Sequence, residues 1–541
     1  MAGVSPVSRR VMNLSHFLRA NSRRLGREIG FVQGDQSCTW LDLDERVDAL
    51  AHALSAKGVV KGDRVLVQSK NCRQMFESMF VCWRLGAVWV PTNYRQTPSE
   101  VAYLAQASGA TAMICHADFP EHAAAACGAA PEISVVVSIG PCAFGQDYEV
   151  LVEQHRGASF LAADVEHDDP CWFFFTSGTT GRPKAAVLTH GQMGFVATNH
   201  LNDLMPDMTP SADASLVVAP LSHGAGIHQL AQTARGVKTV LLSQDRLDAD
   251  EAWSLVQRWR ITNMFTVPTI VKALTEHPSV DVYDHSSLKY VIYAGAPMYR
   301  EDQRHALRKL GKVLVQYFGL GEVTGAITVL PPQLHDAEDL PDLPIGSCGY
   351  ERTAMQVSIQ DDNGREVPAL ETGEICVCGL AVFAGYHDNP EANAKAFRNG
   401  WFRTGDLGHQ DEAGYVYITG RASDMYISGG SNIYPREIEE KILTHPAIAE
   451  AAIVGAPDPQ WGEVGVAVIV LREGGVCTRD DLLSHLADKV ARYKLPKQVF
   501  FWDSLPRSGY GKITKKAISE ELAKRGLVVS TDRSMSPDRS A

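Results

Sequence analysis

Short β-branched runs alternate with helical patterns between residues 30 and 320, and this alternation limits the fold more than any other feature. The run Arg64-Val65-Leu66-Val67-Gln68, for example, is typical of a strand, and a helical pattern over residues 75–85 follows it. Further strands are expected at residues 112–115, 134–138, 215–219, 239–242 and 290–293. Such alternation is typical of parallel strands joined by crossover helices. The sequence therefore predicts an α/β fold.

The chain, at 541 residues, is too long for one hydrophobic core. Short alternating strands over about 345–420 predict a small β-rich subdomain, and a compact α/β segment with strands at 453–455, 466–471 and 499–502 follows Asp424. We therefore predict a large N-terminal domain of α/β sheets over 1–423, a small C-terminal α/β domain over 424–526, and a disordered tail over 527–541.

Residues 175–184, Phe-Thr-Ser-Gly-Thr-Thr-Gly-Arg-Pro-Lys, combine hydroxyls, glycines and a lysine directly after an aromatic strand. Glycine lets an anion approach the backbone closely, and hydroxyls and free N–H groups donate hydrogen bonds to it. The spacing is not that of the common nucleotide-binding P-loop, because Pro183 stands where that loop needs glycine and Ala185 follows Lys184. The segment predicts a phosphate-binding loop of a different kind.

Composition excludes several classes of partner. The net charge of −12 argues against nucleic acid or an anionic membrane as the main partner, because both require a basic surface. The eleven cysteines include no C-x-x-C pair, so they indicate neither a zinc site nor a disulfide scaffold. The best apolar stretch, residues 79–91, contains Arg84 and ends at proline, so we expect no membrane span and a cytoplasmic protein.

Residues 1–27 contain six arginines and no acid, a composition that also suits a transit peptide. Val11, Leu14, Phe17 and Leu18 recur at helical spacing, however, and this favours an amphipathic helix that opens the first domain.

Four further motifs follow the loop. They are Phe318-Gly-Leu-Gly-Glu322, Gly400-Trp-Phe-Arg-Thr-Gly-Asp406, Gly420-Arg-Ala-Ser-Asp424 and Pro506-Arg-Ser-Gly-Tyr-Gly-Lys512. Together with the loop, and in this order, they resemble the signatures of the adenylate-forming superfamily, which contains acyl-CoA synthetases, luciferases and peptide-synthetase adenylation domains. The resemblance is strongest to a carboxylic acid:CoA ligase and covers nearly the whole chain. It implies that ATP and the acid form an acyl-adenylate with release of pyrophosphate, and that CoA then displaces AMP.

The resemblance assigns ATP-binding residues to each motif. Phosphate contacts are implied for Thr176, Ser177, Gly178, Thr179, Thr180 and Lys184. Adenine contacts are implied for Gly295, Ala296, Phe318 and Gly319, and ribose contacts for Asp406 and Arg421. Glu322 is the implied ligand of Mg²⁺, which prefers hard oxygen ligands. Thr176 and Glu322 are also implied in catalysis.

Lys512 resembles the lysine that bridges the acid and the α-phosphate, where its charge would offset the repulsion of two anions. Asp424 resembles the hinge about which the mobile C-terminal domain turns between the two half-reactions. One position departs from the family: Gly321 stands where Thr or Ser is usual, so a hydroxyl donor is lost there. Thr324 or a backbone N–H is expected to replace that donor, or adenylation is expected to be slower.

The same resemblance implies a CoA site and an acid site. CoA contacts are implied for Gly429, Gly430, Trp461, Tyr493 and Lys497, although a domain-packing tryptophan and a solvated lysine explain the last residues equally well. The acid pocket is implied for His223, Gly226, Ile227, Leu320 and Ala326, with His223 moving aside for the thiol. No acidic group near this pocket would pair with an ammonium, so amino acids are disfavoured, and aryl, medium-chain and branched acids stay open.

Two other functions remain alternatives. A stand-alone adenylation enzyme would load a separate carrier protein, and a nucleotide-regulated binding protein would have no turnover. The presence of Lys512, Glu322 and Asp406 disfavours the second. The expected small-molecule partners are a carboxylic acid, ATP, Mg²⁺ and CoA, and the oligomeric state, monomer or homodimer, is left open.

Overall fold

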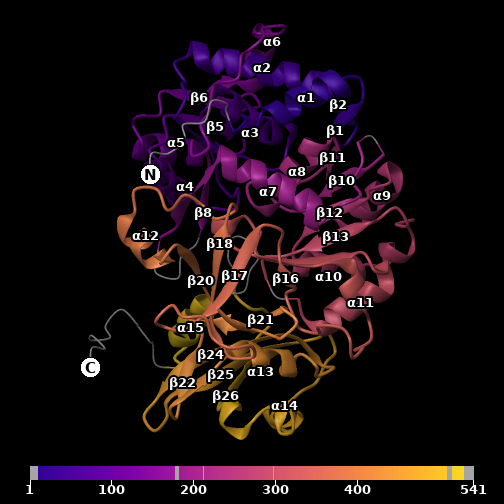
Figure 1. Ribbon diagram of the computed structural model, residues 1–541, viewed down its shortest axis with the longest axis vertical. Helices are drawn as coiled ribbons and strands as arrows, with labels where there is room; N and C mark the ends of the chain where they lie inside the picture. The colour runs from indigo at the N-terminus through magenta and orange to yellow at the C-terminus, as the bar shows by residue number, and fades with distance from the viewer. Residues whose placement is uncertain (1–9, 177–181, 211, 297, 508–513, 529–541) are drawn as a thin grey trace, which may run out of the picture. The chain divides into compact units, whose positions relative to one another are not determined.

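A computed structural model describes residues 10–176, 182–210, 212–296, 298–507 and 514–528 (Figure 1). The chain divides into two compact units. The first comprises Met1–Pro297, Arg304–Ser358 and Cys376–Arg403, and the second comprises Met298–Gln303, Ile359–Ile375 and Thr404–Ala541. Within the described ranges, no helix is long and apolar enough to cross a membrane.

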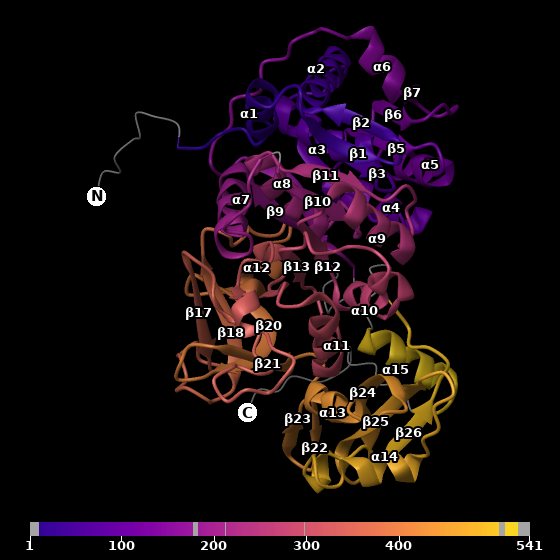
Figure 2. The ribbon, with the colours of Figure 1, turned by 90° about the vertical axis from the view of Figure 1, so that its right-hand side faces the viewer.

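Among the described residues, the first unit contains two large sheets (Figure 2). One sheet has the order β16 (Tyr350–Glu351), β15 (Thr328–Leu330), β14 (Leu314–Phe318), β13 (Tyr290–Tyr293), β12 (Asn263–Thr266), β10 (Ala214–Val217), β11 (Lys238–Leu241), β1 (Ile29–Gln33), β2 (Gln36–Thr39). The other has the order β7 (Gln146–Asp147), β6 (Val135–Ile139), β5 (Ala112–His116), β3 (Arg64–Gln68), β4 (Val88–Pro91), β8 (Pro170–Thr176), β9 (Lys184–Thr189).

Most neighbouring strands of these sheets are parallel, and the antiparallel pairs lie at the sheet edges. The predicted α/β fold class is therefore confirmed. The helices that connect the strands are α2 (Trp40–Ala56), α3 (Arg73–Leu85), α4 (Pro98–Ser108), α5 (Pro120–Ala129), α6 (Tyr148–Gln154), α7 (His190–Asp203), α8 (Gly224–Arg235), α9 (Ala249–Trp259), α10 (Pro268–Glu276) and α11 (Arg300–Leu310).

The helix predicted to open the first domain is present, but it is shorter than the apolar spacing indicates. Helix α1 (His16–Arg24) begins after Val11 and Leu14, so the helical spacing of the apolar residues does not extend to them. The Asn13 amide explains the difference, because it donates hydrogen bonds to the carbonyls of Trp83 at 2.6 Å and Ala163 at 3.1 Å. These hydrogen bonds hold the residues before His16 in a non-helical conformation.

A smaller sheet contains β17 (Met355–Gln360), β18 (Gly373–Gly379), β20 (Trp401–Gln410), β19 (Phe397–Arg398) and β21 (Val416–Arg421), with β21 paired to β20. The division between the units passes through β17, β18 and β20. Helix α12 (Pro390–Ala396) precedes β19, and short 3₁₀ turns are η1 (Pro278–Asp281), η2 (Gly321–Val323) and η3 (Pro332–Leu334).

The second unit is built on a long antiparallel pair, β24 (Ile448–Asp458) and β25 (Gly462–Leu471). It also contains β22 (Tyr426–Ser428), β23 (Ser431–Ile433), β26 (Gln498–Phe501), α13 (Pro435–Ile442), α14 (Arg479–Leu486), η4 (Arg492–Lys494) and α15 (Lys515–Lys524). Buried isoleucines and leucines of α13, α14 and the strands form its core.

The parallel arrangement gathers the loops that carry the predicted site. Strand β12 pairs in parallel with β10 and with β13, and β13 pairs in parallel with β14. The carboxyl ends of all four strands therefore lie at one edge of the sheet. Ligands of open α/β sheets bind at this edge. The segments around His223, Gly295 and Phe318 all follow these strand ends.

Candidate active site

Strands β8 and β9 form an antiparallel pair in which Thr176 faces Lys184 across the connection. The hydroxyl of Thr176 donates a hydrogen bond to Oε1 of Glu322 at 2.8 Å. The predicted phosphate-loop residues Ser177, Gly178, Thr179 and Thr180 lie outside the described residues. The hairpin thus places the two ends of that loop, Thr176 and Lys184, side by side.

Glu322 lies in turn η2 and is 5% exposed. Besides Thr176, the phenol of Tyr386 donates a hydrogen bond to its Oε1 at 2.8 Å. Burial, followed by the negative charge of Glu322, raises the pKa of Tyr386 far above its ordinary value, so the phenol stays protonated and acts as a donor. Lys184 Nζ lies 4.5 Å from the centre of the Tyr386 ring, on the same small cluster.

No sequence motif indicated Tyr386 as a residue of this site. Its segment pairs with β9: the N–H of His387 donates to the Ala185 carbonyl at 2.9 Å, and the N–H of Val187 donates to the Gly385 carbonyl at 2.9 Å. This long-range pairing, rather than a local motif, brings the phenol to Glu322.

The turn after β14 folds back tightly on itself. A Cβ at Gly319 would lie 2.4 Å from the Cα of Gly325, so only glycine permits this approach. Phe318 and Leu320 are partly buried, whereas Ala326 is fully buried. The Thr324 hydroxyl donates to the Val323 carbonyl at 2.6 Å and is buried, so it makes a local contact in this structure.

His223 is the residue that precedes helix α8, and its Nδ1 lies 2.7 Å from the Ser222 hydroxyl. The ring of Phe174 meets the His223 ring edge to face, with centroids 5.5 Å apart. Gly226 and Ile227 follow in the first turn and are buried. A Cβ at Gly226 would lie 2.1 Å from the Leu221 carbonyl oxygen, so close packing requires this glycine.

A second aromatic residue borders the same helix end. A Cβ at Gly224 would lie 2.6 Å from the ring of Phe265 on β12, and Phe265 stacks on Tyr317 with centroids 6.0 Å apart. The sequence pattern marked neither ring, because both read as ordinary apolar strand residues. Gly295, with φ +79°, and Ala296 are exposed directly after β13.

In the second unit, Asp406 and Arg421 are register partners on β20 and β21. The Arg421 Nε donates to the Asp406 carboxylate at 3.0 Å, and the Asp406 side chain is 6% exposed against 47% for Arg421. Asp424 accepts a hydrogen bond from the Ser423 hydroxyl at 3.1 Å, and its N–H donates to the Arg421 carbonyl. The predicted ribose pair is therefore in contact.

The second unit also gathers predicted CoA residues. Gly429 and Gly430, with φ +56° and +80°, form the turn between β22 and β23, and the Gly429 N–H donates to the Trp461 carbonyl at 2.9 Å. Lys497 Nζ lies 5.9 Å from the centre of the Trp461 ring. Tyr493 lies in η4 and, like Trp461, is exposed. Lys512 lies outside the residues that the structure describes.

A family model described as AMP-binding enzyme matches residues 18–387, and one described as AMP-binding enzyme C-terminal domain matches residues 437–512. This chain belongs to the AMP-binding enzyme family.

Relatives of this AMP-binding enzyme include feruloyl-CoA synthase of an Amycolatopsis species, 37% identical over 486 residues that cover 89% of this chain and 93% of that protein. Indoleacetate–CoA ligase of Aromatoleum aromaticum is 33% identical over 499 residues, which cover 92% of this chain and 96% of that protein. The solved o-succinylbenzoate CoA synthetase of Bacillus subtilis, in complex with its acyl-adenylate intermediate, superimposes with a TM-score of 0.80 at 28% identity and covers 93% of this chain and 97% of its own.

These similarities confirm that the chain is an adenylate-forming enzyme and that its class is the AMP-forming acid:CoA ligase. The carrier-protein alternative is less supported. The roles predicted for individual residues stay predictions.

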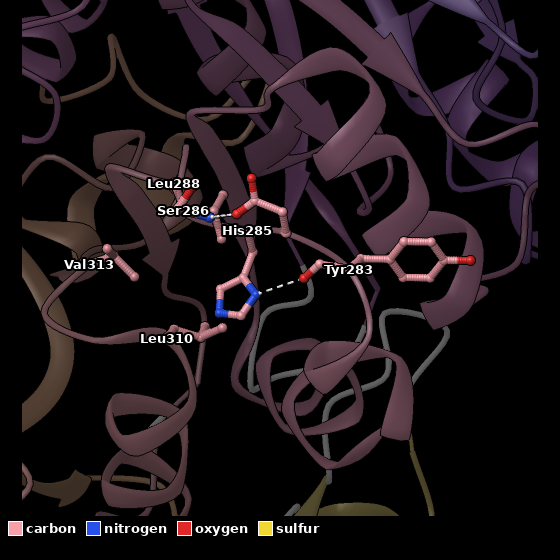
Figure 3. Close-up of a pocket in the computed structure, with 7 residues that line it drawn as sticks. Tyr283, His285, Ser286, Leu288, Leu310 and Val313 are labelled. Atoms are coloured by element: carbon pink, nitrogen blue, oxygen red, sulfur yellow. Dashed lines mark hydrogen bonds between the residues drawn. The ribbon is translucent and has the colours of Figure 1, made fainter.

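A surface hollow elsewhere on this AMP-binding enzyme contains none of the predicted site residues (Figure 3). It is lined by Tyr283, Asp284, His285, Ser286, Leu288, Leu310 and Val313. The His285 Nδ1 contacts the Tyr283 carbonyl at 3.2 Å, and the Ser286 N–H donates to Asp284 at 2.9 Å. Its polar groups are thus used to hold the loop together.

Proposed function

We propose that this enzyme activates an aromatic carboxylic acid with ATP and transfers the acyl group to CoA. The observation that carries the proposal is the contact between the rings of Phe174 and His223. The Phe174 ring also lies against Gly321, the residue directly before Glu322. Flat aromatic acids pack well against such rings. Two relatives named for feruloyl and indoleacetate, both aromatic acids, support the choice of an aryl group over a medium-chain or branched one.

Glu322 would hold Mg²⁺ in the first half-reaction. Among the described residues, both hydrogen bonds to its carboxylate end on Oε1, which leaves Oε2 for the cation. No group of three or more metal-ligating side chains occurs in the described part of the chain. That fits Mg²⁺, which commonly takes one carboxylate together with substrate phosphates and water. The bound cation would offset charge on the phosphates.

The remaining ATP contacts complete the first half-reaction. Thr176 and Lys184, with Ser177, Gly178, Thr179 and Thr180 between them, would bind the departing pyrophosphate. Gly295, Ala296, Phe318 and Gly319 would enclose the adenine, and Asp406 with Arg421 would bind the ribose. Lys512 would neutralise the charge that accumulates when the acid meets the α-phosphate.

The second half-reaction would use the exposed turn of the second unit. Gly429 and Gly430 leave room for the narrow pantetheine arm, while Trp461, Tyr493 and Lys497 offer aromatic faces and a cation for the CoA nucleotide. Residues 424–526 would turn about Asp424 as a mobile domain, and His223 would move aside to admit the thiol.

The enzyme would work in the cytoplasm, as a monomer or as a homodimer. All eleven cysteines are free thiols, which suits the reducing cytoplasm. One chain supplies every residue assigned above, so the proposal holds equally for a monomer and a homodimer.

Pyrophosphate release tests the proposal. The purified enzyme with ATP and Mg²⁺ would be offered a panel of benzoic, arylacetic, arylacrylic, medium-chain and branched acids, and hydroxylamine would trap the acyl-adenylate. We expect aromatic acids to give the highest kcat/KM and to yield thioester when CoA is added. A preference for aliphatic acids would refute the substrate class, and thioester formation on a carrier protein instead of CoA would favour the alternative.

A further inference from the structure

One aromatic residue of strand β8 faces the site instead of the core. Phe173 and Phe175 are buried, with exposed fractions of 2% and 7%. Phe174, which lies between them, and Thr176, which follows them, are only partly buried. Side chains alternate between the two faces of a strand, so Phe174 shares a face with Thr176. Thr176 in turn donates its hydrogen bond to Glu322. Phe174 therefore lies on the face that carries the proposed chemistry.

Gly321 leaves the space that the Phe174 ring occupies. A Cβ built on Gly321 would lie 2.7 Å from two carbons of the Phe174 ring and 2.8 Å from Cγ2 of Thr176. The φ angle of Gly321 is not in the left-handed region, so the backbone itself would accept any residue. Space, not conformation, is what requires glycine at this position.

The Phe174 ring bridges two parts of the site. On one side it covers Gly321, the residue directly before Glu322. On the other side its ring meets His223 edge to face at 79°. It also packs on Trp172, with centroids 5.7 Å apart, and this contact fixes its position. The ring therefore lies between Gly321, the residue before the proposed Mg²⁺ ligand, and the histidine at the start of α8.

We propose that Phe174 is a specificity-determining residue of the acid site, and that Gly321 is the residue that makes room for its ring. The inference rests on the proposed function, in which the acid meets the α-phosphate near Glu322. The ring then lies beside the carboxyl end of the acid and restricts its α-carbon. A flat acid with an unbranched α-carbon passes the ring, whereas an α-methyl group meets it.

The pair also accounts for the missing hydroxyl at position 321. Threonine at this position would place its Cβ 2.7 Å from two carbons of the Phe174 ring, so the threonine and the ring could not both keep these positions. The enzyme has the ring in place of the donor, which gives selectivity at the α-carbon.

Two measurements test the proposal. The first compares cinnamate with α-methylcinnamate, or the best aromatic acid of the panel with its α-methyl derivative, in pyrophosphate release. Phe174→Ala is expected to raise the ratio of kcat/KM for the methylated acid over the parent acid by about tenfold or more, the size of effect that one methyl group gives in a close-fitting pocket. An unchanged ratio would overturn the proposal.

The second measurement is a double-mutant cycle. Gly321→Thr is expected to lower kcat/KM for adenylate formation by about 100-fold, because a small displacement of the acid has effects of that order. Phe174→Ala combined with Gly321→Thr is expected to be about tenfold more active than Gly321→Thr alone, because the clash with the ring is removed while the 2.8 Å contact with Cγ2 of Thr176 is left. A double variant no more active than Gly321→Thr alone, or a fully active Gly321→Thr, would contradict the proposal.

A matched control separates this role from general packing. Phe144 is another partly buried phenylalanine of the first unit, and it packs against the core cluster that contains Phe173 and Phe175, on the face of β8 opposite Phe174. Phe144→Ala should leave the methylated-to-parent ratio unchanged, with melting temperatures recorded for all variants. If the natural enzyme releases no pyrophosphate with any acid, the proposed function fails. If the natural enzyme releases pyrophosphate but the methylated-to-parent ratio does not respond to Phe174→Ala, only the inference about Phe174 fails.

Discussion

The hydroxyl of Thr176 and the phenol of Tyr386 both donate to Oε1 of Glu322, and each hydrogen bond is 2.8 Å long. The contacts join the end of β8 and the segment paired with β9 to turn η2. Charge-assisted hydrogen bonds to a buried carboxylate are among the stronger ones in proteins. They orient Glu322 through Oε1, and neither of them uses Oε2.

Glu322→Gln tests the cation assignment. The amide keeps an oxygen for Thr176 and Tyr386 but loses the charge that Mg²⁺ requires, so kcat for adenylate formation should fall by about 100-fold and more Mg²⁺ should be needed for half-maximal rate. Pyrophosphate release over a Mg²⁺ titration measures both. Glu391→Gln, an exposed glutamate of α12, is the control and should leave both values unchanged. An unaltered Mg²⁺ dependence in Glu322→Gln would exclude Glu322 as the ligand.

Lys512→Ala should separate the two half-reactions. Adenylate formation should be lost, because the charge that offsets two anions is removed, while thioester formation from a preformed acyl-adenylate should be largely spared. The measurements are pyrophosphate release and CoA-dependent release of AMP from the adenylate. Lys516→Ala is the control, because the Lys516 side chain is 76% exposed. Loss of both half-reactions in a folded variant, or of neither, would contradict the assignment.

Local signals in the sequence were sufficient for much of the fold. The strands predicted at Arg64–Gln68 and Tyr290–Tyr293 match β3 and β13, because each has a continuous apolar run bounded by turn residues. The predicted ends of the phosphate loop meet in the β8–β9 pair for the same reason. Such features depend on a few neighbouring residues.

The rest of the site depends on contacts between distant segments. Tyr386 reaches Glu322 through pairing with β9, and no residue near Tyr386 in the chain reveals that pairing. Phe174 read as part of a buried strand, since its face depends on which sheet neighbours cover the strand. The missing hydroxyl at Gly321 was visible in the sequence, but the ring that fills its place was not.

Trp461 and Lys497 give a prediction for the second half-reaction. Lys497 Nζ lies 5.9 Å from the centre of the Trp461 ring, beside Gly429, and the pair is suited to a base and a phosphate. Trp461→Ala and Lys497→Ala should each raise KM for CoA by about tenfold and leave pyrophosphate release without CoA unchanged. Steady-state kinetics with varied CoA measure this, and Lys441→Ala, an exposed lysine of α13, is the control. An unchanged KM in both variants would favour a purely structural role for the pair.

Two buried histidines predict how stability depends on pH. Burial lowers the pKa of His190 and of His228 to about 4, and each has one ring nitrogen buried without a hydrogen-bond partner in the described structure. In the unfolded chain both titrate near 6.5, so below that pH the unfolded state binds more protons than the folded state. Stability should therefore fall as pH decreases from about 6.5 to about 4, by roughly 3 kcal/mol for each histidine, and should not depend on these groups above pH 7.

Melting temperatures between pH 7.5 and 4.5 measure this dependence. His190→Gln and His228→Gln should each lower stability at pH 7.5 but flatten its decline toward pH 4.5, because glutamine does not bind the proton that opposes folding. His16→Gln, an exposed position at the start of α1, should reproduce the slope of the natural protein. Equal slopes in all four proteins would show that carboxylates, and not these two imidazoles, set the acid limit of the fold.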